Sequence, residues 1–175
     1  MAEESRRLFV ALWPGPALAD RLHDLAGEAH RDCGGRRMRR ETLHLTLAFI
    51  GAVPADRLPE LLALLGQLRA PRFQVQLNSL GYWPHNHIVW AGCAEPPPAL
   101  LQLAADIRRQ TAAIGLPASG PAFVPHMTLL RKATATCTPP VAEPVVWDVV
   151  EWVLVESCLT PHGADYHRVA GWALD

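Results

Sequence analysis

The stretch TLHLTLAFI at residues 42–50 alternates polar and apolar residues at its start and is followed by Gly51. This alternation predicts a β-strand with one buried face, and it places His44 and Thr46 together on the other face. The same form returns in the second half of the chain as HMTL at residues 126–129. Two such strands predict two similar lobes that are related by an approximate two-fold axis.

Further elements follow from the hydrophobic periodicity on either side of these motifs. Apolar residues spaced three and four apart predict helices at residues 17–30, 55–69 and 99–114. Short apolar or alternating runs predict strands at residues 7–13, 72–82, 87–93, 145–159 and 166–173, with a hairpin between the second and the third. Because hairpins accompany the alternating strands and helices, we expect an α+β fold of mainly antiparallel sheet.

The length of 175 residues fits a single domain over residues 1–175 that is made of two lobes. Each lobe is expected to bury its apolar face in its own core, beneath its flanking helices. The two His/Thr pairs are then expected to face each other across a central cleft.

The composition excludes several classes of protein. Half of the residues are hydrophobic and the formal net charge is −1, which is typical of a globular protein and does not mark a nucleic-acid binder. The sequence has no signal peptide and no apolar run of the roughly 18 residues that a membrane helix needs. The four cysteines are scattered, as is typical of reduced thiols. We therefore expect a cytoplasmic protein without a membrane partner, and a monomer by default.

Positive charge is concentrated at one place, RDCGGRRMRR at residues 31–40, which holds five arginines around a Gly-Gly pair. Two interpretations stay open at this point. The segment is either a solvated loop or a phosphate-contacting loop that leads into the first motif.

The two motifs have the chemistry of phosphoryl transfer. Near neutral pH one imidazole can be neutral and the other protonated, so His44 and His126 can supply the base and the acid for displacement at phosphorus. The hydroxyls of Thr46 and Thr128 can donate hydrogen bonds to the non-bridging phosphate oxygens, and Arg131 can hold the phosphate. No Asp or Glu accompanies either motif. The sequence therefore predicts a site without a metal or another cofactor.

Aromatic residues are candidates for contact with a nucleobase. Phe9 and Trp90 can offer a stacking surface, and Tyr166 can approach the cleft or serve only the structure.

The paired His-x-Thr motifs resemble those of the two-histidine (2H) phosphoesterase superfamily, and in particular the RNA 2′,3′-cyclic phosphodiesterases, also called 2′-5′ RNA ligase-like proteins. The resemblance extends over nearly the whole chain. It includes RLFVAL at residues 7–12, the glycine after the first motif, the arginine after the second, and ESCL at residues 156–159. Thr42 departs from the asparagine of many members.

The resemblance implies metal-free hydrolysis of a terminal 2′,3′-cyclic phosphate of RNA to a 2′-phosphate. His126 is then the base that activates water, and His44 is the acid that protonates O3′, although a pseudo-symmetric site can run in reverse. Ligation of 2′-5′ RNA ends is the secondary activity. The alternatives are a cyclic phosphodiesterase for small nucleotides or 2′-5′ oligoadenylate, and a non-catalytic protein that binds RNA ends. A metallophosphoesterase is disfavoured by the missing carboxylates.

Overall fold

The computed structural model describes residues 4–134, 141 and 143–175, and it confirms the α+β fold. The helices are α1 (Pro16–Cys33), α2 (Leu58–Leu65) and α3 (Pro98–Ala113), with short 3-10 turns at Arg40–Thr42 and Ala55–Arg57. The strands are β1 (Ser5–Leu12), β2 (Arg36–Arg37), β3 (Leu45–Pro54), β4 (Phe73–Leu77), β5 (Ser79–Trp83), β6 (Ile88–Gly92), β7 (His126–Arg131), β8 (Val145–Val149), β9 (Glu151–Thr160) and β10 (Gly163–Ala173).

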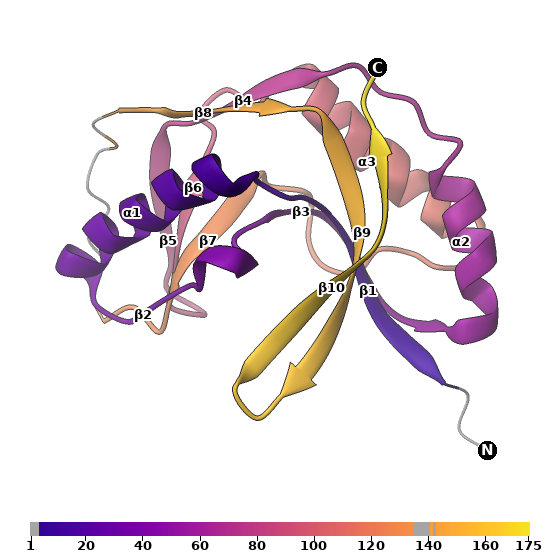
Figure 1. The fold of residues 1–175 in the computed structure, drawn as a ribbon, viewed down its shortest axis with the longest axis horizontal. Coiled ribbons are helices and arrows are strands. Elements are labelled where there is room, and N and C mark those ends of the chain that lie inside the picture. The colour runs from indigo at the N-terminus through magenta and orange to yellow at the C-terminus, as the bar shows by residue number, and fades with distance from the viewer. Residues whose placement is uncertain (1–3, 135–140, 142) are drawn as a thin grey trace.

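One large sheet positions both motifs. Its strand order is β10-β9-β1-β3-β7-β6-β5, with β2 paired to β7, and its paired strands are antiparallel. The two halves of this sheet meet at β3 and β7, where a single register pair, Leu45 with Met127, joins them. Figure 1 shows these two groups of strands on either side of the centre of the molecule. The two predicted motif strands are therefore direct neighbours.

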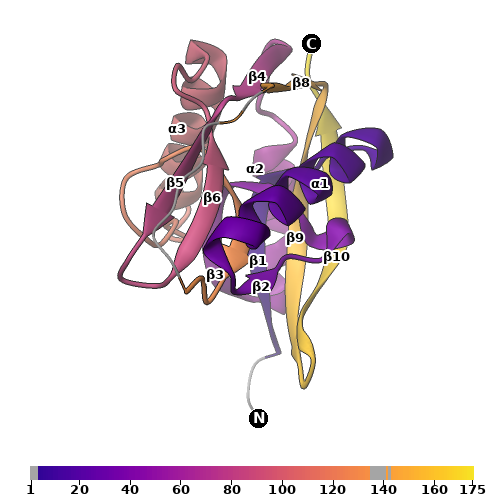
Figure 2. The same cartoon turned by 90° about the vertical axis from the view of Figure 1, so that its left-hand side faces the viewer.

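The helices cover the sheet in an exchanged arrangement. The N-terminal helix α1 packs on β7, whereas α3 from the second half of the chain packs on β3. Figure 2 shows α1 in front of the sheet, with α2 and α3 on the far side of it. A single hydrophobic cluster includes Leu45 and Leu47 of β3 as well as Met127 and Leu129 of β7. The expectation that each lobe has its own core is wrong, because each sheet half needs a helix from the other half of the chain.

Two predicted strands are divided in the structure. The 72–82 run breaks at Asn78, whose backbone N–H donates to the Gly92 carbonyl and whose side-chain oxygen accepts from the Ala94 N–H. Only β5 forms the predicted hairpin with β6, while β4 pairs with β8 in a separate two-stranded sheet. The 145–159 run breaks at Val150, whose carbonyl accepts from the Leu174 N–H. The apolar positions change phase at each break, from Leu77 to Leu80 and from Val149 to Trp152, a signal that the prediction of one strand over each run did not use.

The remaining expectations concern the cysteines and the membrane. Cys93 and Cys158 are free thiols, Cys33 is buried, and Cys137 lies outside the described residues. Among the helices of the described residues, none has the length and apolar character that crossing a membrane requires.

Candidate active site

The single pair between β3 and β7 gathers the four motif side chains. In an antiparallel pair, opposed residues point to the same face of the sheet. When the Leu45–Met127 register is extended by one residue each way, His44 lies opposite Thr128 and Thr46 lies opposite His126. The two histidines are then diagonal neighbours, which in such pairs lie about 7–8 Å apart. The His/Thr pairs therefore form one polar group around a local two-fold axis.

All five predicted site residues line one cleft, with a volume of about 440 Å³. His44, Thr46, His126, Thr128 and Arg131 are all half-buried. Among the residues that the structure describes, no Asp or Glu lines this cleft, and its charged side chains are arginines and histidines. Such a lining favours an anion over a cation.

Both imidazole rings are held in the same way. Nδ1 of His44 lies 2.7 Å from the Thr42 carbonyl oxygen, and Nδ1 of His126 lies 2.7 Å from the Val124 carbonyl oxygen. A carbonyl oxygen can only accept, so each Nδ1 carries a hydrogen and donates it. In the neutral ring, Nε2 is then the atom that can accept a proton. The backbone therefore sets both rings in the tautomer that acid–base catalysis through Nε2 needs.

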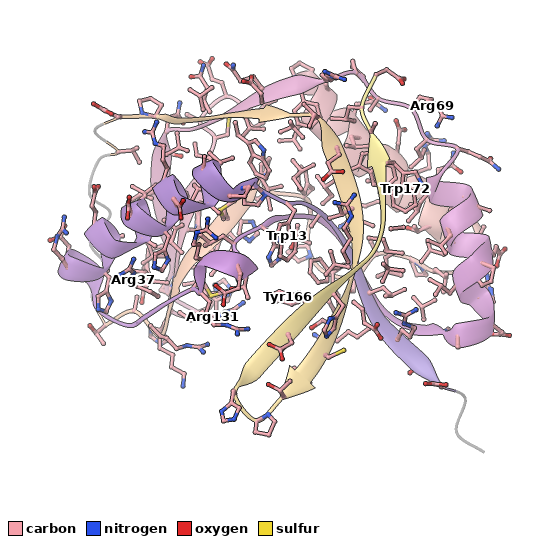
Figure 3. The ribbon with its side chains drawn as sticks, viewed as in Figure 1. Trp13, Arg37, Arg69, Arg131, Tyr166 and Trp172 are labelled. Atoms are coloured by element: carbon pink, nitrogen blue, oxygen red, sulfur yellow. The ribbon has the colours of Figure 1, made fainter. Side chains whose placement is uncertain are left out.

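Aromatic side chains surround His44. Trp13 stacks on its ring at a centroid distance of 5.0 Å and an interplanar angle of 7°. Phe9 lies at 5.0 Å, and the ring of Tyr166 meets His44 edge-on at 5.2 Å. Figure 3 shows Trp13 and Tyr166 close together near the centre of the molecule. Tyr166 lines the cleft, which is one of its two expected positions. Phe9 also lines the cleft but is only 3% exposed, so it offers little surface for stacking on a base.

The aromatic neighbour of His126 in the cleft is Trp83, which the sequence did not single out. Trp83 meets the ring edge-on at 4.6 Å and lines the cleft. Trp90 lies farther from His126, at 6.3 Å, and is not among the cleft-lining residues. Its indole covers Gly81 and Gly92, where an added Cβ would lie 2.0 and 2.4 Å from the ring. Trp90 therefore packs against the sheet and does not offer a stacking surface in the cleft.

The surroundings lower the pKa of both histidines, and they do so unequally. The pKa of His44 is lowered to about 4, mainly by burial and also by the positive charges of His126 and Arg131, while the bond to the Thr42 carbonyl opposes this change. Burial also lowers the pKa of His126, against the bond to the Val124 carbonyl. Near pH 7 both rings are neutral in the free protein. One of them must therefore gain a proton when an anion binds.

The sequence did not single out several cleft residues. Arg7, Trp83 and Asn86 line the cleft, and the Arg7 guanidinium lies 4.7 Å from the centre of the Phe49 ring. Trp13 does not line the cleft but stacks on His44. Arg7 does carry a signal in the sequence, because it shares the face of β1 with Phe9 at a spacing of two. Trp83 and Asn86 follow from the hairpin between β5 and β6, whose position against β7 depends on tertiary packing.

The arginine-rich segment, residues 31–40, is neither a solvated loop nor a phosphate-contacting loop over its whole length, because three of its arginines bind other parts of the protein. Arg37 turns away along α1 and donates to the His23 carbonyl at 2.8 Å. Arg40 bonds to Asp20 and to the Pro16 carbonyl, and Arg39 donates to Asp165 at 3.0 Å. These three arginines tie the segment to α1 and to the β9–β10 hairpin. Arg36 remains exposed at the end of β7.

Within the ranges that the structure describes, no three His, Cys, Asp or Glu side chains are grouped so that they could hold a metal ion. The cleft thus combines two backbone-held histidines, two hydroxyls and two arginines, a set of groups suited to binding and transferring a phosphoryl group.

The fold and this cleft define a phosphoesterase of the two-histidine class. The sequence model of the 2′-5′ RNA ligase superfamily matches residues 14–164, and the chain belongs to this family. The match confirms the resemblance that the two motifs suggested.

Several relatives are similar over most of their length. The RNA 2′,3′-cyclic phosphodiesterase of Escherichia coli is 34% identical over 98% of both chains. That of Thermus thermophilus is 34% identical over 91% of this chain and 86% of its own. Crystal structures of E. coli LigT, without ligand and with 3′-AMP, each match this chain with a TM-score of 0.90 at 34% identity. Both matches cover 98% of this chain, and they cover 98% of LigT in the first structure and 99% in the second.

Proposed function

We propose that this protein is an RNA 2′,3′-cyclic phosphodiesterase, which hydrolyses a terminal 2′,3′-cyclic phosphate to a 2′-phosphate. The observation that carries the proposal is the carboxylate-free cleft in which the backbone holds His44 and His126 in matching tautomers. The names of the relatives and the 3′-AMP bound to E. coli LigT support a nucleotide phosphate as the ligand.

The two histidines have distinct roles in this proposal. Nε2 of His126 takes a proton from water as the water oxygen attacks phosphorus. The P–O3′ bond then breaks, and Nε2–H of His44 delivers a proton to O3′. One water is consumed, and the products are a 3′-hydroxyl and a 2′-phosphate. Thr46, Thr128 and Arg131 hold the charge that develops on the non-bridging oxygens.

The assignment of His44 as the acid has support in its surroundings. An anionic phosphate beside Arg131 offsets the charge that lowers the pKa of His44. The Trp13 ring stacked on His44 also favours the protonated imidazolium, because the face of an indole attracts cations. His126 stays neutral and accepts the proton from water.

The wider assignments complete the proposal. The substrate is an RNA end that carries the cyclic phosphate, and the protein acts as a cytoplasmic monomer without a cofactor. In 2′-5′ ligation at the same site, a 5′-hydroxyl attacks phosphorus in place of water, the P–O3′ bond breaks, and a 2′-5′ phosphodiester forms; the reverse of this step cleaves a 2′-5′ bond. The domain is a single unit over residues 1–175.

The test is single-turnover cleavage in EDTA of a short RNA that ends in a 2′,3′-cyclic phosphate. His44→Ala and His126→Ala are each expected to lower the rate by about 10²–10⁴-fold, the usual contribution of a general acid or base. His167→Ala is the matched control, because this histidine is exposed and does not line the cleft. Binding without cleavage by the wild type would show an RNA-end binding protein, and loss of activity in EDTA would show a metal enzyme.

The roles are separated by a substrate in which sulfur replaces O3′. A thiolate leaves without a proton, so this substrate is expected to restore cleavage by His44→Ala and not by His126→Ala. Restoration of His126→Ala alone would reverse the assignment.

A further inference from the structure

Two arginines face each other at the end of the cleft. In the register of β2 with β7, Arg36 lies directly opposite Arg131. Opposed side chains in an antiparallel pair have Cβ atoms about 4.5–5.5 Å apart, and like charges at this spacing are destabilising. Neither guanidinium has a hydrogen bond or an ion pair with any described residue. The pair thus lacks the anion that would stabilise it.

The chain is built to bring these two side chains together. Gly35 has a φ of 82°, and a Cβ at this position would lie 2.7 Å from the Arg131 carbonyl oxygen. A glycine is therefore needed for β2 to approach the end of β7 so closely. The close approach produces the Arg36–Arg131 pair.

A small cavity of about 140 Å³ contains both arginines and opens beside the catalytic cleft. The two cavities share Thr42, Arg131 and Tyr166. The small cavity is also lined by His162 at the tip of the β9–β10 hairpin, and no described carboxylate lines it. Of its other arginines, Arg39 is paired with Asp165, and Arg37 donates to the His23 carbonyl. Among the described residues, the guanidinium groups of the cavity that have no hydrogen-bond partner are therefore those of Arg36 and Arg131.

Another cavity next to the catalytic cleft is acidic. This cavity, of about 740 Å³, shares Tyr166 with the cleft. It is lined by Glu41, Asp148 and Glu151, and its arginine, Arg168, is paired with Glu151. A polyanion that leaves the cleft is repelled on this side and attracted on the side of Arg36.

We propose that Arg36 forms a second phosphate subsite next to Arg131, which holds the terminal phosphate, and that Arg36 binds the phosphodiester that precedes the terminal nucleoside of an RNA substrate. This inference rests on the proposed function and identifies the part of the RNA end, beyond the cyclic phosphate, that the protein binds. Guanidinium groups suit the role, because each can donate two parallel hydrogen bonds to one phosphate.

The test compares two dinucleotides that end in a 2′,3′-cyclic phosphate. One has a normal internucleotide phosphodiester, and the other has a neutral methylphosphonate, so bases and sugars are the same. For the wild type, kcat/KM is expected to favour the charged dinucleotide by about tenfold or more, as for one hydrogen bond to a charged group. In Arg36→Gln this preference is expected to fall to about twofold.

The control variant is Arg69→Gln, because Arg69 lies at the other end of the molecule from Arg131 (Figure 3) and is expected to keep the full preference. An equal preference in Arg36→Gln and the wild type would overturn the subsite. If no substrate is cleaved, the proposed function fails, and the same preference measured as a ratio of Kd values still tests the subsite.

Discussion

At the residue scale, the chemistry depends on the contrast between two histidines that share the same backbone restraint. His44 is stacked against Trp13, and its pKa is lowered to about 4. His126 meets Trp83 edge-on, and its pKa is lowered as well. The two rings have the same backbone hydrogen bond, but the pKa of His44 is lowered more than that of His126.

The pH dependence of kcat/KM follows from these shifts. The competent free protein holds one proton on the pair, and above both lowered pKa values this form decreases tenfold for each pH unit. We expect kcat/KM to be highest below pH 6.5 and to fall by about tenfold between pH 7 and 8. The pH profile of the wild type measures this, with His167→Ala as the control. A constant or rising kcat/KM between pH 6.5 and 8 would contradict it.

The hydroxyls of the motifs give a second residue-scale prediction. Thr46→Val and Thr128→Val keep the shape of the side chain and remove one donor each. If the hydroxyls bind the transition state, each change is expected to lower kcat by about 10²–10³-fold, the range for one oxyanion donor, with a smaller change in KM. Steady-state kinetics checks this. A rise in KM with an unchanged kcat would show that the hydroxyls bind only the ground state.

The residue types of the candidate site could be predicted from the sequence, because alternation along a strand fixes which side chains share a face. His44, Thr46, His126 and Thr128 reach the cleft for this reason. Arg131 lies five residues after His126, so alternation alone would place it on the other face; it reaches the cleft because the register of β7 against β6 shifts between Thr128 and Leu130. Trp83 and Asn86 could not be found in this way. Their hairpin reaches the cleft only because β6 pairs with β7, and that pairing is not encoded in local periodicity.

At the element scale, β2 is the most constrained segment of the site. It contains two residues, and it follows a glycine whose Cβ would collide with the end of β7. Gly35→Ala is expected to reduce the free energy of unfolding by about 2–4 kcal/mol, through the left-handed backbone and the collision together. Chemical denaturation measures this change.

The control for this glycine is Gly120→Ala. Gly120 also has a positive φ, of 93°, but has no atom within 4 Å of the added Cβ. Only the backbone cost of about 1–2 kcal/mol is expected there. Equal losses at the two positions would show that the contact with β7 adds nothing.

The presence of the helices could be predicted from the sequence, but the strands on which they pack could not. The leucine spacing within residues 55–69 is real, yet α2 ends at Leu65 and begins only at Leu58, after a 3-10 turn. Nothing in the amphipathic pattern of α1 indicates that it packs on β7, since an apolar stripe specifies burial and not its partner.

At the scale of the whole molecule, the exchanged helices connect the two halves of the sheet. One hydrophobic cluster includes side chains from β3, β7 and the helices that cover them. We expect one cooperative unfolding transition, in which tryptophan fluorescence and far-UV circular dichroism change together. Two separate transitions would show lobes that fold independently and would contradict the assignment of a single domain.

The strand order also determines when the protein can work during its own synthesis. β1 lies between β9 and β3, and β3 needs β7 as its other neighbour. A ribosome that has released only the first half of the chain therefore presents unpaired strand edges and the apolar face of α1, which must be kept from aggregating. His44 leaves the exit tunnel long before His126, and the wall that contains Tyr166 comes last. The nascent chain is expected to remain without catalytic activity until translation is nearly complete.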